Sequence, residues 1–229
     1  MFTGIVEEVG TVAEVATDPL GGSAGGKVRI EASAVLPKLE IGSSIAVSGC
    51  CLTVTEKDEN GFACDLSPET LLRTAFPRLR PGARINLETS LTLDKPLGGH
   101  IVQGHVDGVG TLLSLIPIGD GNYWLDVEVP PALARYLVEK GSVAVEGISL
   151  TVAGIDGTVL RIAIIPFTIE NTNLNSLQPG DPVNVECDVV AKYVEKLVGE
   201  RAAPAATPEK KAASDGTRLT LERLREEGF

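Results

Sequence analysis

Two short stretches of the sequence share one pattern but carry different reactive side chains. The first is SGCCLTV at residues 48–54, and the second is EGISLTV at residues 146–152. When the two are superimposed, Cys51 falls on Ser149, so one copy offers a thiol and the other a hydroxyl. A thiolate is a nucleophile, and a hydroxyl beside a base can pass a proton. The pattern therefore predicts two related sites with unequal chemistry.

The same offset aligns a much longer part of the chain. The matching pairs include Pro68 with Pro166, Thr70 with Thr168, Asn86 with Asn184 and Glu88 with Glu186. After a small shift, GIVEEVGTV at 4–12 also matches GHVDGVGTL at 104–112. Two copies indicate a duplicated domain, because a solenoid needs at least three stacked repeats. We therefore expect an N-terminal domain over residues 1–97 and a C-terminal domain over residues 98–188.

The repeat also draws attention to a histidine. His105 stands in GHVDG where the first copy has Ile5. Histidine titrates near neutral pH and can accept a proton, so we expect His105 to act with Ser149 in the second domain. A single histidine is also often structural, and that alternative stays open. His100 follows two glycines and is interpreted as a loop or hinge residue.

The hydrophobic pattern predicts an all-β fold. Short runs rich in Val and Ile alternate with polar residues and end at Gly, Pro, Asn or Asp. About six such strands in each copy predict two similar, Greek-key-like, closed β-barrels of six strands, since closure removes exposed edges. A short helix is expected at 131–140, with a counterpart at 33–40.

The C-terminal part differs from the repeat. Asp188 can cap a helix over residues 189–200, which we expect to be an oligomerisation helix. Its apolar positions follow helical spacing and are Val190, Tyr193, Val194, Leu197 and Val198. Two closed barrels leave such a stripe without an obvious partner in the chain. Residues 201–229 are expected to form a flexible tail.

Composition narrows the class of protein. A formal net charge of -11 disfavours nucleic acid as a partner. The sequence has no apolar run of 18 or more residues, so no membrane association is expected. Four cysteines without a Cys-x-x-Cys pair, and only two histidines, predict no metal site and free thiols. Free thiols favour a reducing compartment, and we expect the cytoplasm.

Several motifs together resemble a known family. MFTGIVEEVG, GCCLTV, GGHIVQGHVDG, GISLTV and IPFTIENTNL are similar, in this order, to riboflavin synthases of the α-chain type. The resemblance covers residues 1 to about 199, with departures at Ser48 and Phe167. It implies a homotrimer of two-barrel chains that converts two molecules of 6,7-dimethyl-8-ribityllumazine into riboflavin and 5-amino-6-ribitylaminouracil. It implies no cofactor and no metal, and lumazine synthase is a candidate partner.

The resemblance and the repeat together suggest roles for residues in both copies. The expected catalytic residues are Cys51, His105, Ser149 and Thr151. In the first copy the expected substrate-binding residues are Gly4, Ile5, Val6, Cys51, Leu52, Thr53, Asp65, Leu66, Ser67, Pro68, Glu69 and Thr70. In the second copy they are Gly104, His105, Val106, Lys140, Ser149, Leu150, Thr151, Ile165, Pro166, Phe167, Thr168, Ile169 and Glu170.

Simpler interpretations remain beside these roles. Cys51 can be a small buried hydrophobe, Thr53 and Thr151 can be ordinary β-branched strand residues, and Asp188 can be only a helix cap. The main functional alternative is a lumazine- or flavin-binding antenna protein that catalyses nothing. The presence of Cys51, His105, Ser149 and Thr151 together favours the enzyme. An oligonucleotide-binding barrel ranks far behind, because aromatics are scarce and the charge is negative.

Overall fold

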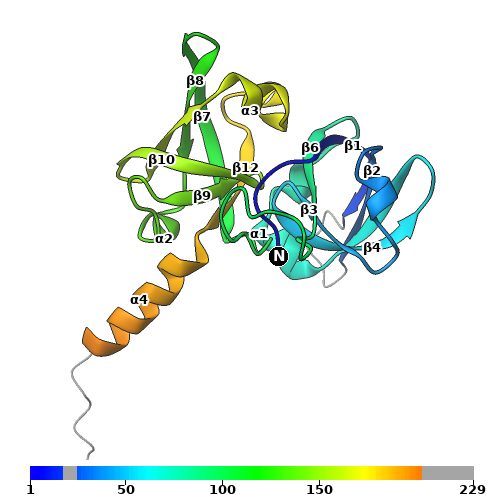
Figure 1. Cartoon of the computed structure of the whole chain (residues 1–229), viewed down its shortest axis with the longest axis horizontal. Coiled ribbons are helices and arrows are strands. Elements are labelled where there is room, and N and C mark those ends of the chain that lie inside the picture. Colours follow the sequence, from blue (N-terminus) through cyan, green and yellow to red (C-terminus); the bar gives the residue numbers. More distant parts are fainter. Residues whose placement is uncertain (18–24, 203–229) are drawn as a thin grey trace, which may run out of the picture. The chain divides into compact units, whose positions relative to one another are not determined.

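The computed structural model describes residues 1–17 and 25–202 of the 229-residue chain. It contains two closed barrels of antiparallel strands, one built from β1 to β6 and one from β7 to β12 (Figure 1). The predicted pair of six-stranded barrels is therefore confirmed. Several strands end shortly before glycine, proline or aspartate, such as β3 before Gly49, β4 before Asp58 and β5 before Pro68.

The first barrel follows the order β1-β2-β5-β4-β3-β6 and then closes on β1. Its strands are β1 (Glu8–Thr17), β2 (Gly26–Glu31), β3 (Ser44–Val47), β4 (Cys50–Lys57), β5 (Gly61–Leu66) and β6 (Arg84–Thr89). Short helical turns connect them: η1 (Leu36–Lys38), α1 (Pro68–Arg73) and η2 (Phe76–Arg78).

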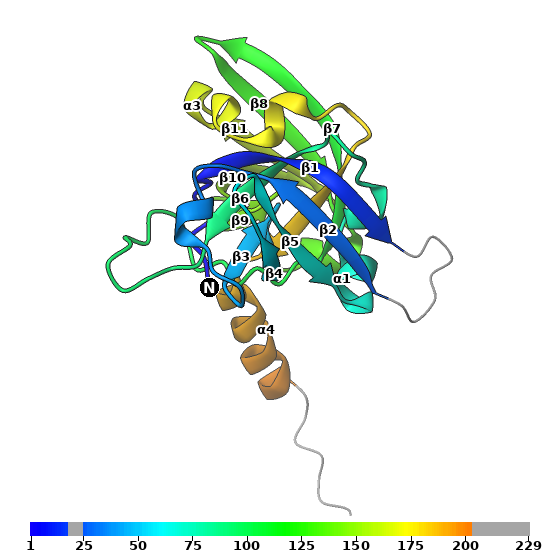
Figure 2. The ribbon, with the colours of Figure 1, turned by 90° about the vertical axis from the view of Figure 1, so that its right-hand side faces the viewer.

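The second barrel repeats this order as β7-β8-β11-β10-β9-β12. Its strands are β7 (Gly108–Gly119), β8 (Asn122–Glu128), β9 (Ser142–Val145), β10 (Ile148–Asp156), β11 (Val159–Ile164) and β12 (Pro182–Cys187). The connecting turns are α2 (Pro131–Ala134), α3 (Pro166–Glu170) and η3 (Asn173–Ser176). The β7–β8 hairpin is a long antiparallel ribbon (Figure 2). The matching order confirms the internal duplication.

The strand period of two separates core from surface in both barrels. On β4, Leu52 and Val54 are buried, whereas Cys51 is half-buried and Thr53 is exposed. The fourth strand of the second barrel, β10, repeats this alternation. Successive side chains of a strand point to opposite faces, so the reactive side chains lie on the outside of each barrel and the apolar ones fill it.

The expected helices before β3 and β9 are much shorter than predicted. Instead of helices over 33–40 and 131–140, the structure has η1 with three residues and α2 with four. Lys140 adopts a φ of 65°, and its N–H donates to the Val152 carbonyl at 2.8 Å. This left-handed residue sets the end of the segment before β9, and helical structure within the segment is limited to the four residues of α2. The helices α1 and α3 were not predicted from the sequence.

The expected C-terminal helix is present as α4 (Val189–Ala202). Asp188 caps its start, because the Val190 N–H donates to Asp188 Oδ1 at 2.9 Å. The predicted apolar positions are exposed in the chain by more than half, from Val194 at 53% to Tyr193 at 65%. Most of the predicted tail, residues 203–229, lies outside the described residues.

Candidate active site

Cys51 and Ser149 occupy equivalent places on the outer faces of the two barrels. Cys51 on β4 pairs with Ala46, and Ser149 on β10 pairs with Ala144. Both alanines are buried in a small apolar cluster with Phe2 and Val102. Cys51 packs against the same cluster. The two reactive side chains therefore flank the apolar contact between the barrels.

The segments that precede the barrels are crossed. The Ser149 N–H donates to the Gly4 carbonyl at 2.7 Å, and the Cys51 N–H donates to the Gly104 carbonyl at 2.8 Å. Val6 packs against the core of the second barrel, and Val106 against the core of the first. Each segment thus forms the edge of the candidate site on the opposite barrel. The repeat alone did not predict this crossing.

This arrangement corrects the expected grouping of residues. Gly4, Ile5 and Val6 lie beside Ser149, and the segment that carries His105 lies beside Cys51. The side chain of His105 is exposed. His105 was expected to share the second domain's site with Ser149, but its backbone neighbours lie against β4 of the first barrel.

Gly4 and Gly104 make this close approach possible. Their φ angles are 75° and 80°. A Cβ atom on Gly4 would lie 2.6 Å from Ser149 Cβ, and one on Gly104 would lie 2.5 Å from Cys51 Cβ. Both distances are far below a van der Waals contact, so no larger residue fits. The glycines permit close backbone approach to the opposite barrel.

The histidine that contacts Ser149 is His100, the residue interpreted as a loop or hinge. Its Nδ1 lies 2.7 Å from Ser149 Oγ, and its backbone N–H donates to the Thr3 carbonyl at 3.2 Å. Burial lowers the pKa of His100, and the charge of Asp188 partly opposes this. His100 is therefore neutral at pH 7 and can accept a proton.

Two observations mark His100 as more than a packing residue. Its Nε2 is buried and has no hydrogen-bond partner in the structure, although buried polar atoms normally have one. A Cβ atom on the preceding Gly99 would lie 2.7 Å from Ser149 Oγ. The double glycine before His100 was therefore the sequence signal for a chain that must pass close to a reactive strand.

Cys51 differs from the other three thiols. Burial raises the pKa of Cys50, Cys64 and Cys187 to about 12, so these thiols stay protonated. Cys51 is only half-buried and faces outward. All four cysteines are free thiols. Cys51 is the thiol that a ligand on the outer face can reach, in agreement with the expectation that Cys50 and Cys64 belong to the core.

Other predicted site residues differ in where their side chains lie. Thr53 and Asp65 are exposed on neighbouring strands, and the pairing of Val54 with Cys64 places them side by side. Ser67 caps α1 by accepting from the Thr70 N–H at 3.1 Å, which is a local structural role. The side chains of Leu52, Leu66 and Leu150 belong to the barrel cores. Pro68 and Glu69 lie exposed in the first turn of α1.

The remaining residues of the second barrel lie at its open surface. Thr151 is exposed two positions after Ser149, and the segment from Ile165 to Glu170 forms the start of α3 and the helix itself. Ile165 and Phe167 are exposed by 56% and 69%. Pro166, Thr168 and Ile169 are half-buried. Lys140 is exposed in the turn beside Val152, away from the Ser149 end of β10.

A separate cavity of about 330 Å³ lies between the two barrels. Its lining includes Phe76, Arg84, Glu146 and Asn184, but none of the candidate reactive residues. Glu146 is buried there, and burial raises its pKa. The cavity therefore belongs to the contact between the barrels and not to the site at Cys51 or Ser149.

Within residues 1–17 and 25–202, no group of three or more His, Cys, Asp or Glu side chains is arranged to hold a metal ion. Over the same ranges, no helix has the length and apolar character needed to cross a membrane.

The fold and the duplicated motifs define a class of protein. The family model of the lumazine binding domain matches the chain twice, at residues 3–90 and 103–188. The fold is similar to LumP complexed with riboflavin, with a TM-score of 0.73 and 25% identity over 82% of this chain and 99% of that one. LumP complexed with 6,7-dimethyl-8-(1'-D-ribityl) lumazine gives a TM-score of 0.72 at 24% identity, over 81% and 98% of the two chains.

Curated relatives narrow this class further. The chain is 41% identical to riboflavin synthase of Actinobacillus pleuropneumoniae over 229 residues, which is all of both chains. It is 45% identical to riboflavin synthase of Mycobacterium tuberculosis, over 86% of this chain and 98% of the relative. Riboflavin synthase of Bacillus subtilis is 38% identical over 86% and 90%. The chain belongs to the riboflavin synthase family of duplicated lumazine-binding domains.

Proposed function

We propose that the protein is a riboflavin synthase that transfers a four-carbon unit between two molecules of 6,7-dimethyl-8-ribityllumazine. The products are riboflavin and 5-amino-6-ribitylaminouracil. The observation that carries this proposal is the pair of equivalent sites with unlike side chains, Cys51 on β4 and Ser149 on β10. A reaction between two identical molecules in unlike roles needs two similar pockets with different chemistry. Holding the two together can lower the barrier by roughly 7–11 kcal/mol.

The Ser149 site is suited to the proton transfer that starts the reaction. A methyl group on carbon 7 of the donor lumazine must lose a proton. Ser149 Oγ lies on the outer face of β10, and neutral His100 lies 2.7 Å behind it. We propose that Ser149 accepts this proton while it passes its own to His100, so that the pair acts as the base.

The Cys51 site is suited to the acceptor lumazine. Cys51 lies on the outer face of β4. The Gly104–Val106 segment forms the edge of the site around this thiol. We propose that Cys51 contacts and stabilises the acceptor ring, with Thr53 and Asp65 as polar contacts on the same face. His105, on the same segment, then serves this site.

The open faces of the single chain support a site shared between chains. Ile5, Thr53, His105, Thr151 and Phe167 are all exposed. A ligand pocket normally buries most of its ligand, so these surfaces need a cover. We propose a homotrimer in which the first barrel of one chain faces the second barrel of its neighbour. The exposed apolar stripe of α4 supplies a contact between chains.

The activity is tested by incubating the protein with the lumazine and following riboflavin absorbance. One riboflavin is expected for every two lumazines consumed, without added cofactor, and a chelator should have no effect. Tight binding of one yellow ligand without turnover would instead support a non-catalytic antenna protein.

We also propose that the protein functions in the cytoplasm. Four free thiols, one of them on a reactive surface, favour a reducing compartment such as the cytoplasm. The small-molecule partner is the lumazine. Lumazine synthase is a candidate protein partner, and co-elution of the two proteins would test this association.

A further inference from the structure

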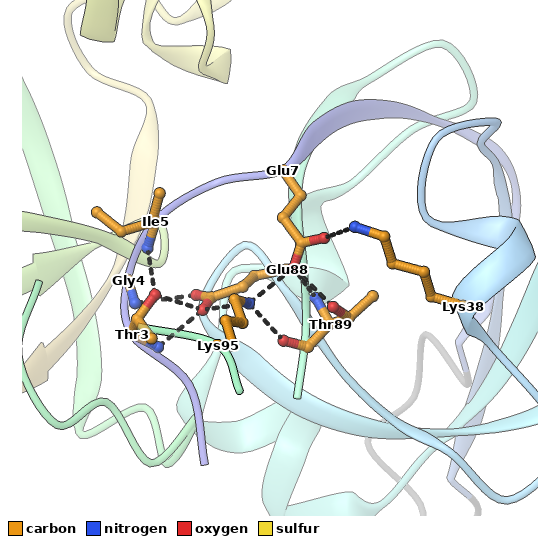
Figure 3. Close-up of polar contacts among 8 residues, drawn as sticks. All are labelled: Thr3, Gly4, Ile5, Glu7, Lys38, Glu88, Thr89 and Lys95. Carbon is orange, nitrogen blue, oxygen red and sulfur yellow. Dashed lines mark hydrogen bonds and ion pairs between the residues drawn. The ribbon is translucent and has the colours of Figure 1, made fainter. Parts of the chain in front are cut away.

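The edge of the Ser149 site is held by a buried carboxylate of the first barrel. Glu88 Oε1 accepts the Thr3 N–H and the Thr3 hydroxyl, both at 2.7 Å. Glu88 Oε2 accepts the Gly4 N–H at 2.9 Å. Both oxygens of one side chain therefore face donors of the segment that approaches Ser149 (Figure 3). Lys95 lies 3.3 Å from the same carboxylate.

The edge of the Cys51 site is held in the same way by the second barrel. Glu186 Oε1 accepts the Gln103 N–H at 2.7 Å, and Glu186 Oε2 accepts the Gly104 N–H at 2.9 Å. Burial raises the pKa of Glu186, and these two N–H groups oppose the rise. Glu88 and Glu186 occupy matching places near the ends of β6 and β12. Each glutamate with the backbone N–H groups that it accepts is called a clamp here, and the clamp occurs in both copies of the repeat.

We propose that Glu88 and Glu186 are positioning residues, each of which fixes the edge of the site on the opposite barrel. Glu88 belongs to the first barrel and holds Gly4, whose carbonyl accepts from Ser149. Glu186 belongs to the second barrel and holds Gly104, whose carbonyl accepts from Cys51. The inference rests on the proposed function for the meaning of these sites, but its geometry does not depend on turnover.

A carboxylate has a specific advantage at these positions. Glutamate accepts at both oxygens, whereas glutamine of the same size replaces one oxygen with an NH₂ donor. In either clamp that NH₂ would face a backbone N–H and leave a buried donor without a partner. E88Q and E186Q therefore preserve size and remove the clamp. A carboxylate that only filled space in its own barrel would not connect either substitution with the opposite barrel.

The experiment uses two probes that do not require activity. Cys51 reports on the first barrel through its rate of alkylation by iodoacetamide, measured peptide by peptide with mass spectrometry. His100 reports on the second barrel through its imidazole NMR signals. The chain has two histidines, so H105Q assigns these signals. Turnover of lumazine is measured in parallel.

The expected pattern is crossed. E186Q should raise the alkylation rate of Cys51 by about fivefold or more and leave the His100 signals in place. E88Q should shift the His100 signals and leave Cys51 alkylation within about twofold of the parent. The reverse pattern, or folded variants with neither change, would overturn the proposal. A crossed pattern in a protein that makes no riboflavin would keep the clamp and reject the proposed function.

Milder measurements cover the case in which a glutamine variant does not fold. T3V is nearly isosteric and removes the Thr3 hydroxyl, which donates to Glu88 and accepts the Ile5 N–H at 3.2 Å, so it should shift the His100 signals without affecting Cys51. In the unmodified protein, amide hydrogen exchange at Gly4 and Gly104 should be slow. Rapid exchange at both glycines would show that neither carboxylate holds its segment.

Discussion

At the scale of single residues, the protein uses position to make one thiol different from its neighbour. Cys50 and Cys51 are adjacent, yet a strand sends them to opposite faces. Burial raises the pKa of Cys50 to about 12, whereas Cys51 faces the outer surface beside Gly104. The adjacent pair therefore contains a natural control for the reactivity of Cys51.

C51A should lower turnover by about tenfold or more, because it removes a group proposed to contact the acceptor ring. C50A removes a buried, protonated thiol and should affect turnover much less. Both variants should remain folded, as measured by circular dichroism. Equal and small losses in the two variants would show that neither thiol takes part in the reaction.

The two histidines should separate in their pH dependence. Because burial lowers the pKa of His100, this base stays neutral until the pH falls below the ordinary histidine range near 6.5. Turnover should then fall as His100 takes up a proton, which gives the pH profile a decrease on its acid side, called the acid limb.

H100Q should lower turnover by about 10²–10⁴ and remove this acid limb, and S149A should cause a loss of similar size. H105Q also lowers turnover but should retain the limb, measured as kcat against pH. Loss of the limb in H105Q alone would assign the base to His105.

At the scale of elements, the barrels were predictable and the crossing of their leading segments was not. Period-two patterns such as Leu52 and Val54 determine which face of a strand is buried, and the repeat predicts the same barrel twice. The same patterns are satisfied whether residues 1–7 lie on the first barrel or on the second. That choice depends on contacts between distant segments, such as Ser149 with Gly4 and Cys51 with Gly104.

The prediction of His105 as the partner of Ser149 was wrong for the same reason, because the contact depends on segments that are distant in the sequence. Sequence alignment of the copies favours His105, because it stands opposite Ile5 in a repeated motif. His100 lies in the connection between the barrels, where it has no equivalent to compare. Only the folded connection brings its Nδ1 to Ser149 Oγ. The short helices α1 and α3 were missed although Ser67-Pro68 is a usual helix start, because six and five residues carry little periodic signal.

The stability of the contacts that the Glu7 carboxylate makes in the first barrel should decrease in acid. Burial opposes the charge on Glu7, but hydrogen bonds from Lys38, Lys95 and Thr89 outweigh it and hold its pKa at about 2 (Figure 3). A lowered pKa stabilises the folded state above the ordinary value of 4.5, and this contribution disappears as the pH falls toward 2.

E7Q should lower the free energy of unfolding at pH 7 by about 1–3 kcal/mol, since it breaks charge-assisted hydrogen bonds. Its stability should change less than that of the parent between pH 4.5 and 2. The measurement is urea unfolding at a series of pH values and one protein concentration. The exposed Glu59 provides the control variant E59Q, which should follow the parent. An unchanged acid dependence in E7Q would rule out Glu7 as its source.

At the scale of the whole molecule, duplication gives two candidate sites, and the residues around both are exposed on the single chain. Each barrel closes on itself, so neither can cover the other's outer face with its own strands. The segments that cross between the barrels supply one edge for each site. In the proposed homotrimer, a neighbouring copy covers the exposed residues around Cys51 and Ser149.

The helix α4 should hold these copies together. Val190, Tyr193, Val194, Leu197 and Val198 form one apolar stripe at helical spacing, and all are exposed by more than half in the single chain. Burying such a stripe against equivalent helices is favourable by roughly 25 cal/mol per Å² of apolar surface. A chain truncated after Gly199 retains the stripe and should remain trimeric and active. A chain truncated after Asp188 should fall to monomers and lose most of its turnover while its barrels remain folded.

A substitution tests the same contact without removing the helix. L197D places a charge in the apolar stripe and should weaken the trimer, whereas K196D changes an exposed position beside it and should not. Mass in solution, measured by light scattering over a range of concentrations, gives the assembly state, and riboflavin formation gives the activity. Because each site is proposed to need two chains, turnover in L197D should rise with protein concentration more steeply than the first power as trimers form. A fully active monomer, in either L197D or the chain ending at Asp188, would show that one chain completes its own site and that α4 has another role.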